Sequence, residues 1–254
     1  MLSSVQLYSV RDSLAHDAEG TLRSLRSSGF ERVEPFALLQ HQDMLRDLLP
    51  TTGLQAPSAH ASLLDVEDPG PTLRAAADLG VDTVIEPYWN PEDWESEAGV
   101  RSVADRLNAL VGPARDHGVR IGYHNHDFEC VPHFEGLTGL EVLAQHLAPE
   151  IVLELDTYWA AVGGSDPTHL LGALGERVQL LHLKDGPITK DTAAQLPLGE
   201  GAMDVPSILR AAPWVEYGVI EFDDYADDVL DGVAQSLTYL GMLTPAGGTG
   251  QDER

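Results

Sequence analysis

The sequence has one cysteine and two lysines among its 254 residues, and each shortage excludes a class of protein. Cys130 has no second cysteine to pair with, so the chain forms no internal disulfide. The 41 acidic residues outnumber the 15 basic ones, and the formal net charge is −26. A field of that sign repels phosphate backbones, so we expect no nucleic-acid partner.

Long apolar runs are missing as well. No stretch reaches the roughly 18 apolar residues of a membrane-spanning helix, so we expect no membrane association. The first residues show no basic segment followed by an apolar core, which argues against a secretory signal. With a lone cysteine, this favours a cytoplasmic location. Gly-x-Ser-x-Gly, Walker A and Cys-x-x-Cys motifs are absent too, which disfavours a serine or cysteine nucleophile.

Helix-like segments that end in glycine alternate with short apolar runs along the chain. For example, Leu73–Ala77 leads to Gly80 and then to the run Val84–Glu86. Glycine just past a helix supplies the left-handed conformation that ends it. Continuous apolar runs fit strands that are buried on both faces. The alternation therefore predicts βαβ units and a parallel sheet.

Eight such strands can be counted, which is the number in a closed (β/α)8 TIM barrel of about 250 residues. An open doubly wound sheet would need a glycine-rich phosphate loop after an early strand, and the sequence has none. We expect one barrel over residues 1–243 and a disordered tail over 244–254. The strands are expected at Val5–Tyr8, Arg32–Glu34, Leu54–His60, Thr83–Glu86, Arg120–His124, Ile151–Asp156, Val178–His182 and Tyr217–Glu221.

Several of these strands end in carboxylates and imidazoles. In a parallel barrel all strand C-termini lie on one face, so these side chains converge there. Carboxylates and neutral imidazoles are ligands for divalent metals. The expected metal ligands are His124, Asp156, His182 and Glu221.

Other side chains near the expected mouth suit proton transfer and substrate binding. A lysine buried beside a metal has its pKa lowered by desolvation, so Lys184 is a candidate proton carrier. Glu154 lies deeper than Asp156, where an unpaired charge is costly, so it either pairs with a neighbour such as Lys184 or takes part in catalysis. The candidates for catalysis are His126, Glu129, Lys184 and Glu221, and those for substrate contact are Glu34, His60, Glu86, Asn125, Trp159 and Glu200.

Two further expectations concern the surroundings of the mouth. Phe36 and Trp89 are expected to form an apolar wall beside a sugar ring. The acids that follow Glu221 are expected to be solvated or to lie at a helix N-terminus. They are Asp223, Asp224 and Asp227.

Four motifs together make the chain resemble the xylose-isomerase-like TIM-barrel superfamily, often called the sugar phosphate isomerase/epimerase family. They are Tyr123-His124-Asn125-His126-Asp127-Phe128-Glu129, Glu154-Leu155-Asp156-Thr157-Tyr158-Trp159, Leu181-His182-Leu183-Lys184-Asp185 and Gly199-Glu200-Gly201. The resemblance implies a divalent metal (manganese, magnesium, cobalt or zinc) at the barrel mouth. It also implies isomerisation, epimerisation or dehydration of sugars and inositols.

The resemblance also implies a ligand set of Glu, Asp, His and Glu, and one member departs from it. Asp156, His182 and Glu221 match, but His124 stands at or next to the place of the first Glu, and Glu129 follows five residues later. This departure disfavours a symmetric mechanism in which two metal-bound glutamates exchange protons.

The sequence-based hypothesis is a divalent-metal-dependent isomerase or epimerase that moves a proton α to the carbonyl of a small sugar or keto-sugar. One alternative is a dehydratase or lyase that acts on an inositol or keto-glycoside with the same metal site. Another is a degenerate, non-catalytic carbohydrate-binding barrel. An abasic-site endonuclease is disfavoured by the charge. No arginine cluster is expected at the mouth, so a neutral sugar is preferred, and a homodimer is left open.

Overall fold

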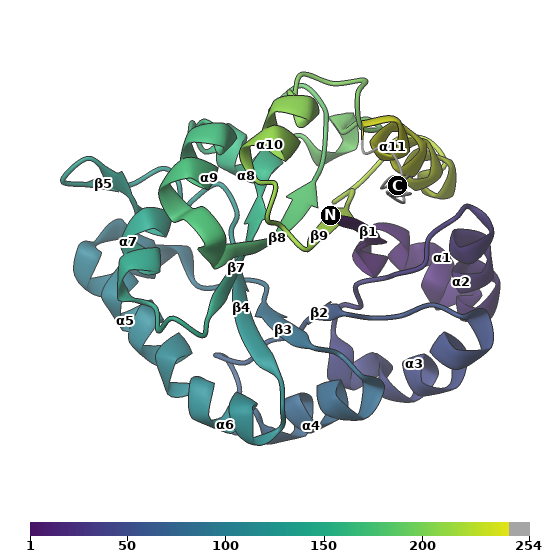
Figure 1. The fold of residues 1–254 in the computed structure, drawn as a ribbon, viewed down its shortest axis with the longest axis horizontal. Helices are drawn as coiled ribbons and strands as arrows, with labels where there is room; N and C mark the ends of the chain where they lie inside the picture. The colour runs from purple at the N-terminus through teal and green to yellow at the C-terminus, as the bar shows by residue number, and fades with distance from the viewer. Residues whose placement is uncertain (244–254) are drawn as a thin grey trace, which may run out of the picture.

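A computed structural model describes residues 1–243 of the chain, and parallel strands form a central ring with helices around it (Figure 1). Within these residues the ring is a seven-stranded sheet of order β1-β9-β8-β7-β4-β3-β2. The expectation for 244–254 lies outside the described residues. The strands are β1 (Leu2–Val5), β2 (Ser58–His60), β3 (Thr83–Glu86), β4 (Arg120–His124), β7 (Val152–Asp156), β8 (Val178–Leu183) and β9 (Tyr217–Ile220).

Residues 31–35 occupy the eighth position of the barrel, where the sequence predicts a strand at Arg32–Glu34. They form isolated parallel bridges instead of a regular strand. On one side the Glu34 amide donates to Val5 O at 2.7 Å, and on the other the Val33 amide donates to Gln55 O at 2.9 Å. These bonds join the β1 and β2 edges into a seam, which confirms the predicted barrel with seven regular strands rather than eight.

The first strand lies earlier than the sequence predicts. It ends at Val5, and Leu7–Val10 forms the 3-10 helix η1 instead of continuing the strand to Tyr8. The side chain of Gln6 accepts a hydrogen bond from the Tyr8 amide at 3.1 Å, which caps this helix and turns the chain. The turn places Tyr8 at the rim of the barrel.

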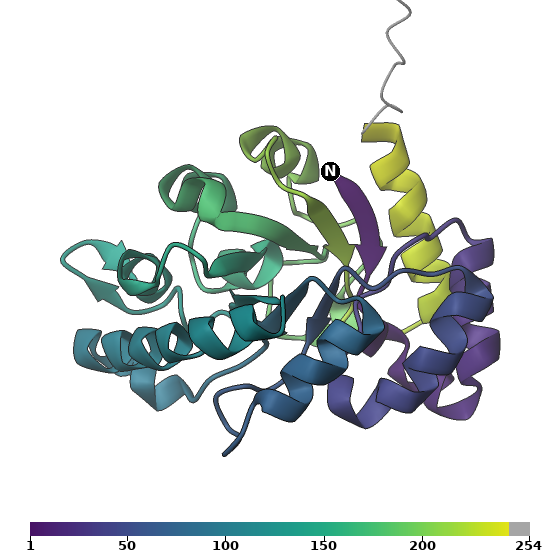
Figure 2. The same cartoon turned by 60° about the horizontal axis from the view of Figure 1, so that its bottom comes forward.

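Helices cover the outside of the ring, as the view in Figure 2 shows. Glycine ends α4, since Gly80 adopts φ 72°, a left-handed conformation that glycine reaches without strain. A short antiparallel hairpin, β5 (His133–Phe134) with β6 (Leu137–Thr138), lies between β4 and α7. The α-helices are α1 (Arg11–His16), α2 (Ala18–Ser27), α3 (Leu38–Thr52), α4 (Gly70–Leu79), α5 (Glu97–Ala109), α6 (Val111–Asp116), α7 (Gly139–His146), α8 (Thr157–Val162), α9 (Pro167–Leu174), α10 (Val205–Ala211) and α11 (Val229–Leu243).

The main apolar core fills the space between sheet and helices, and the inside of the ring changes character along its axis. Ile85, Val152 and Leu180 form a separate apolar cluster, with Tyr217 packed against it. Two residues further along β7, on the same face, stands Glu154. The ring interior is therefore apolar toward the strand starts and polar toward the strand ends.

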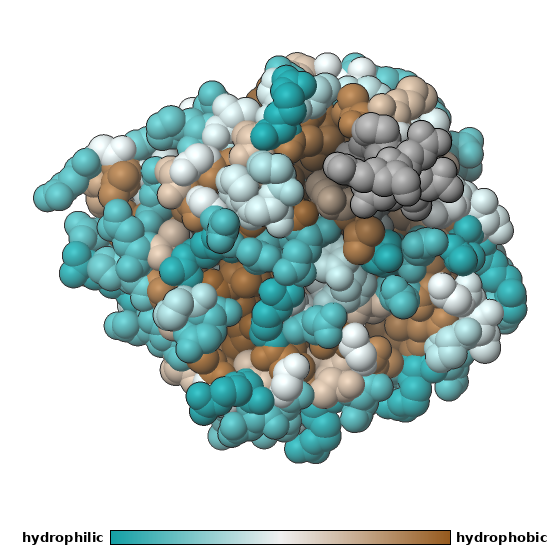
Figure 3. Space-filling model, in the orientation of Figure 1, coloured by the Kyte–Doolittle hydropathy of each residue, from teal (hydrophilic) through white to brown (hydrophobic). Residues whose placement is uncertain are grey.

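The outer surface is mostly hydrophilic over the outer helices (Figure 3). Among the described residues, none of the helices combines the length and the apolar character needed to cross a membrane.

Candidate active site

Strand register brings the expected metal ligands together. The Cα partner of His124 on β7 is Glu154, and the Cα partner of Asp156 on β8 is His182. Partners in a parallel sheet point to the same face, so the side chains of these two pairs all enter the ring. His124, Asp156, His182 and Glu221, here called the mouth tetrad, are buried, and each offers a ligand atom within 4.8 Å of the others.

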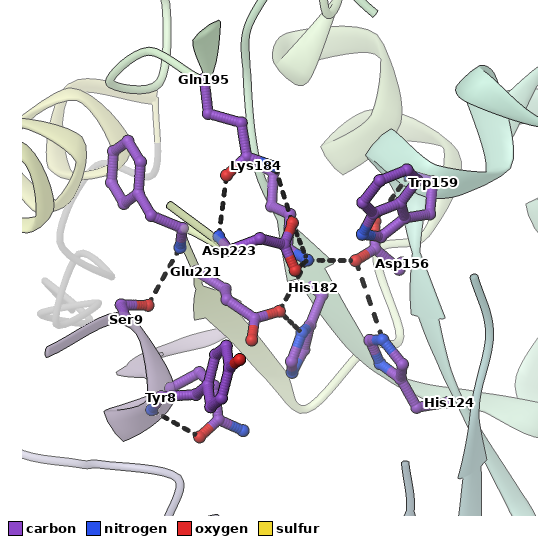
Figure 4. Close-up of polar contacts among 12 residues, drawn as sticks. Tyr8, Ser9, His124, Asp156, Trp159, His182, Lys184, Gln195, Glu221 and Asp223 are labelled. Carbon is purple, nitrogen blue, oxygen red and sulfur yellow. Dashed lines mark hydrogen bonds and ion pairs between the residues drawn. The ribbon is translucent and has the colours of Figure 1, made fainter. Parts of the chain in front are cut away.

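Lys184 lies among three carboxylates at the mouth (Figure 4). Its Nζ is 2.9 Å from Asp156 Oδ2, 2.8 Å from Glu221 Oε2 and 2.9 Å from Asp223 Oδ2. Burial alone would lower the pKa of Lys184, but these carboxylates outweigh it and hold the pKa well above its usual value. This direction is opposite to the fall expected beside a metal, and the role of Lys184 as a proton carrier stays a prediction.

Opposing charges also set the protonation of the tetrad. Burial favours the neutral form of Glu221, yet Lys184 and His182 hold its pKa well below the usual value. His182 Nδ1 lies 2.6 Å from Glu221 Oε2, and Glu154 and Glu221 outweigh desolvation to raise the pKa of His182. Burial raises the pKa of Asp156 to about 6, although Lys184 opposes the shift.

Below the tetrad lies a second layer of carboxylates and imidazoles. Glu154 Oε2 is 2.6 Å from His60 Nε2, 3.0 Å from His182 Nε2 and 3.1 Å from His124 Nδ1. Glu34 Oε1 lies 2.8 Å from His182 Nε2 and accepts a hydrogen bond from Gln6 Nε2 at 2.9 Å. Glu34 is thus beneath the site, linked to His182 and away from any substrate.

A cavity of about 390 Å³ opens above the tetrad, and His124 and Glu221 form part of its lining. His126 and His60 line it too, as expected for groups that meet a substrate. Burial lowers the pKa of His126 to about 4, and nearby Lys184 adds to the shift, so this imidazole is neutral at neutral pH. Aromatic side chains complete one wall; they are Tyr8, Phe36 and Tyr88.

The donor set of the tetrad fits a divalent metal. Two imidazoles and two carboxylates match the ligands preferred by zinc, manganese and cobalt. Asp156 Oδ2 is buried and accepts no well-directed hydrogen bond, although it is paired with Lys184. Four buried carboxylates (Glu34, Glu154, Asp156 and Glu221) face one buried lysine, and they raise the pKa of His60 and of His182 against the effect of burial. A bound divalent cation would take the place of the protons that these imidazoles hold.

Strand parity keeps Glu86, one of the expected acids, out of the cavity. Glu86 is the neighbour of Ile85, whose side chain enters the ring, so Glu86 points outward. Its Oε2 accepts hydrogen bonds from the Leu63 and Leu64 amides at 2.7 and 2.8 Å. Glu86 therefore supports the loop at Leu63 and Leu64 and does not make the expected contact with a substrate.

Glu129 is likewise buried behind the site. Its carboxyl group accepts hydrogen bonds from Tyr123 Oη at 2.8 Å and from the His126 amide at 2.8 Å. Burial raises the pKa of Glu129 to about 8. Glu129 does not line the cavity, so it holds the backbone of His126 rather than reaching the mouth as a base.

Asn125 and Glu200 are also not available to a substrate in the cavity. Asn125 Oδ1 accepts from the Asp156 amide at 2.9 Å, and its Nδ2 donates to Asp156 O at 3.2 Å. The Asn125 amide therefore clamps β4 to β7. Glu200 is exposed and lines a separate surface hollow beside Tyr239.

Trp159 and Trp89 have different surroundings. The Trp159 ring is buried, 5.7 Å from Lys184 Nζ, and its Nε1 makes no hydrogen bond. The place expected for Trp89 on the cavity wall belongs to Tyr88, because Trp89 donates to Asp93 at 2.7 Å and stacks under Arg106.

One functional residue was missed. Asp223 was expected to be a solvated or helix-terminal charge, but it lines the cavity, pairs with Lys184 and accepts from Gln195 Nε2 at 2.7 Å. Its position two residues after Glu221, the spacing that separates Asp156 from Glu154, was a signal of a shared inward face.

Known proteins share this architecture. Residues 22–217 match the model of the xylose isomerase-like TIM barrel family. Inosose dehydratase 2 of Bacillus cereus is 27% identical over 150 residues, which cover 59% of this chain and 43% of that protein. The match thus spans less than half the length of this curated relative.

Two solved structures show the same fold. A sugar phosphate isomerase/epimerase from Parabacteroides distasonis has a TM-score of 0.76 and 24% identity, covering 96% of this chain and 94% of that chain. The IolI protein, solved with a bound zinc atom, has a TM-score of 0.75 and 16% identity, covering 96% and 98% of the two chains.

Proposed function

The chain belongs to the xylose isomerase-like TIM barrel family, and we propose on that basis that it is a divalent-metal-dependent isomerase or epimerase acting on a small sugar or keto-sugar. The observation that carries the proposal is the buried mouth tetrad, two of whose members, His124 and Glu221, line the cavity of about 390 Å³. The bound zinc of IolI, a structural neighbour, supports a metal here.

The cavity suits a small, uncharged carbohydrate. Pockets of roughly 300–1,000 Å³ are typical of small-molecule sites. Phe36 and Tyr88 offer apolar ring faces, while His60 and Asp223 offer polar contacts to hydroxyl groups. The lining within residues 1–243 contains no arginine, so the chemistry favours a sugar without phosphate.

The metal would be held by His124, Asp156, His182 and Glu221, and when bound it supplies Lewis-acid stabilisation of the charge that develops as a proton leaves beside a carbonyl. Lys184 adds a positive charge at the same place. Two groups of the cavity wall can accept the proton: neutral His126 and the carboxylate of Glu221.

A second candidate is a dehydratase that acts on an inositol-derived ketone. It is favoured by the sequence similarity to inosose dehydratases. The first step, removal of the proton α to the carbonyl, is the same, and a hydroxyl group then leaves from the next carbon. The two candidates are separated by their products, since dehydration loses water and isomerisation keeps the mass.

The test begins with elemental analysis of the purified protein and of an Asp156→Ala/His182→Ala variant. We expect about one metal per chain in the wild type and none in the variant. An Asp191→Ala/His169→Ala variant, which removes the same residue types from exposed positions, is the matched control and keeps its metal. Stoichiometric metal in the mouth variant would contradict the assigned site.

The metal identified in this way is then used in a substrate screen. Keto-sugars and inososes are incubated with the protein in deuterated water, and NMR records exchange at the α carbon while mass spectrometry records loss of water. We expect exchange with at least one substrate and loss of exchange in the mouth variant. Metal binding without exchange on any of them would favour the non-catalytic barrel.

A further inference from the structure

We propose that Glu154 is a positioning residue that fixes a ring proton on His124 and on His182, so that the opposite ring nitrogen of each faces the proposed metal site. The inference rests on the proposed metal site. Glu154 itself is not a member of the mouth tetrad, and its carboxylate lies one layer deeper in the ring.

Three imidazole rings converge on one oxygen atom of the Glu154 carboxylate. Glu154 Oε2 lies within 3.1 Å of an imidazole nitrogen of each of three histidines, which come from β2, β4 and β8. An ionised carboxylate only accepts hydrogen bonds, so each of these nitrogens carries its proton toward Glu154. The three histidines are His60, His124 and His182.

The ring nitrogens of His124 and His182 that do not face Glu154 point toward the other members of the mouth tetrad. His124 turns Nδ1 to Glu154 and places Nε2 3.8 Å from Asp156 Oδ2. His182 turns Nε2 to Glu154 and to Glu34, and places Nδ1 beside Glu221. The single proton of a neutral imidazole, held below on His124 Nδ1, leaves a lone pair above on Nε2. His182 Nδ1 lies 2.6 Å from Glu221 Oε2 and therefore holds a second proton, which a bound metal would displace. Both rings are thereby oriented for coordination.

The hydrogen-bond partners of Glu154 differ from those of the buried glutamates that support the backbone. Glu86 and Glu129 accept hydrogen bonds from backbone amides. Within residues 1–243, every hydrogen bond and ion pair of the Glu154 carboxylate is made to an imidazole, and its Oε1 has no partner. The contacts of Glu154 therefore serve the histidines.

A second metal in this deeper layer is the competing explanation, because His60, His124, Glu154 and His182 also form a compact set of ligand atoms. Three nitrogens of that set already lie 2.6 to 3.1 Å from Glu154 Oε2, which is direct hydrogen-bond distance. An ion at their centre would have to force these atoms apart. At the mouth only His182 Nδ1 and Glu221 Oε2 are this close, at 2.6 Å, while His124 Nε2 is 3.8 Å from Asp156 Oδ2, so coordination there displaces fewer direct contacts.

The experiment compares the wild type with Glu154→Gln. Glutamine replaces the ionised carboxylate by a neutral amide whose oxygen is a weaker acceptor, so the preference of the His124 proton for Nδ1 falls and Nε2, on the metal side, is protonated more often. We expect Co²⁺ binding, followed by its visible absorption, to weaken about 10- to 100-fold. Long-range ¹H–¹⁵N spectra of the metal-free protein should show His124 protonated at Nδ1 in the wild type and a larger share of the Nε2-protonated form in the variant.

Glu129→Gln is the matched control, because it makes the same carboxyl-to-amide change at a buried site that touches none of the three rings. It should keep the wild-type Co²⁺ affinity and His124 proton. If Glu154→Gln does not fold, Glu154→Asp replaces it; the shorter carboxylate retreats from the rings, and weaker binding is again expected.

The outcomes separate the two proposals. Failure of the wild type to bind Co²⁺ overturns the proposed metal site. Wild-type binding with the same affinity in a folded Glu154 variant overturns only the positioning role. A second Co²⁺ per chain that is lost in His60→Gln would assign Glu154 as a ligand instead.

Discussion

At the scale of single residues, the position of an acidic residue along its strand decides whether its side chain enters the ring or points outward. Asp156 and Glu154 stand two apart on β7 and both enter the ring, whereas Glu86 follows an inward residue and points out. The outward acids lie under helices and loops, away from water. Burial raises the pKa of Glu86 and of Glu129, because it favours the neutral form of a carboxyl group.

The pH dependence of stability should report the buried acid Glu129. Burial raises its pKa to about 8, against about 4.3 in an unfolded chain, so between these values only the folded state holds the proton. This contribution to stability is present at low pH and is lost as pH rises toward about 8. In Glu129→Gln the loss is absent, a difference of up to about 1.4 kcal/mol per pH unit.

Urea unfolding of both proteins at several pH values between about 5 and 8 checks this expectation. The free energy of unfolding of the variant, relative to that of the wild type, should increase steadily as pH rises. Parallel stability curves would show that Glu129 is ionised in the folded protein.

Side chains whose role follows from strand alternation could be predicted from the sequence, and those whose role depends on neighbours could not. The convergence of Asp156 and His182 follows from their place at strand ends. The pKa of Lys184 depends on three carboxylates from different strands, which the local sequence does not reveal. The clamp of Asn125 on Asp156 depends on the register of β4 with β7.

At the scale of elements, a single carboxylate organises the connection from β8 to α10. Asp185 Oδ1 accepts from the Gly186 and Met203 amides at 2.8 and 3.0 Å, and Oδ2 accepts from the Gly199 amide at 2.9 Å. In the sequence, Asp185 closes the motif Leu181-His182-Leu183-Lys184-Asp185. Its structural role is to hold both ends of the segment 186–203 together.

Replacing Asp185 by alanine should loosen that segment. The change removes the acceptor of three amides, and each buried group left unpaired costs about 1–3 kcal/mol. We expect limited proteolysis to cut within 186–203 much faster than in the wild type. Asp191→Ala, an exposed acid of the same segment, is the control and should be cut at the wild-type rate. Equal rates for both variants would show that other contacts hold the segment.

Strands with continuous apolar runs were placed well from the sequence, and those shaped by side-chain hydrogen bonds were not. Thr83–Glu86 and Arg120–His124 have the predicted bounds. The run Leu54–His60 gives a regular strand only from Ser58, because Pro57 has no amide proton for the ladder. The early end of β1 depends on the cap made by Gln6.

At the scale of the whole molecule, the net charge of −26 is the dominant property. Acidic side chains repel one another over the hydrophilic outer surface (Figure 3), and this self-repulsion destabilises the compact state. Salt screens it, with a Debye length of about 10 Å at 0.1 M and about 3 Å at 1 M. The homodimer and the cytoplasmic location stay predictions.

The metal-free protein should therefore become more stable as salt is added. We expect a gain on the order of 1 kcal/mol between low salt and about 0.5 M, which corresponds to about 2–4 °C in Tm. Thermal unfolding in sodium chloride and in tetramethylammonium chloride provides the measurement. Both salts should act alike, and an effect of sodium alone would point to specific cation binding instead of screening.

The seam at residues 31–35 is the part of the barrel wall where we expect local opening to occur most easily. A regular ladder must break several neighbouring bonds together, whereas the isolated bridges around Glu34 can open independently of each other. Because the Glu34 carboxylate also holds His182 Nε2, each opening of the seam releases one anchor of a candidate ligand. We therefore expect motion of the ring wall at residues 31–35 to be coupled to the orientation of His182 through a single side chain, Glu34.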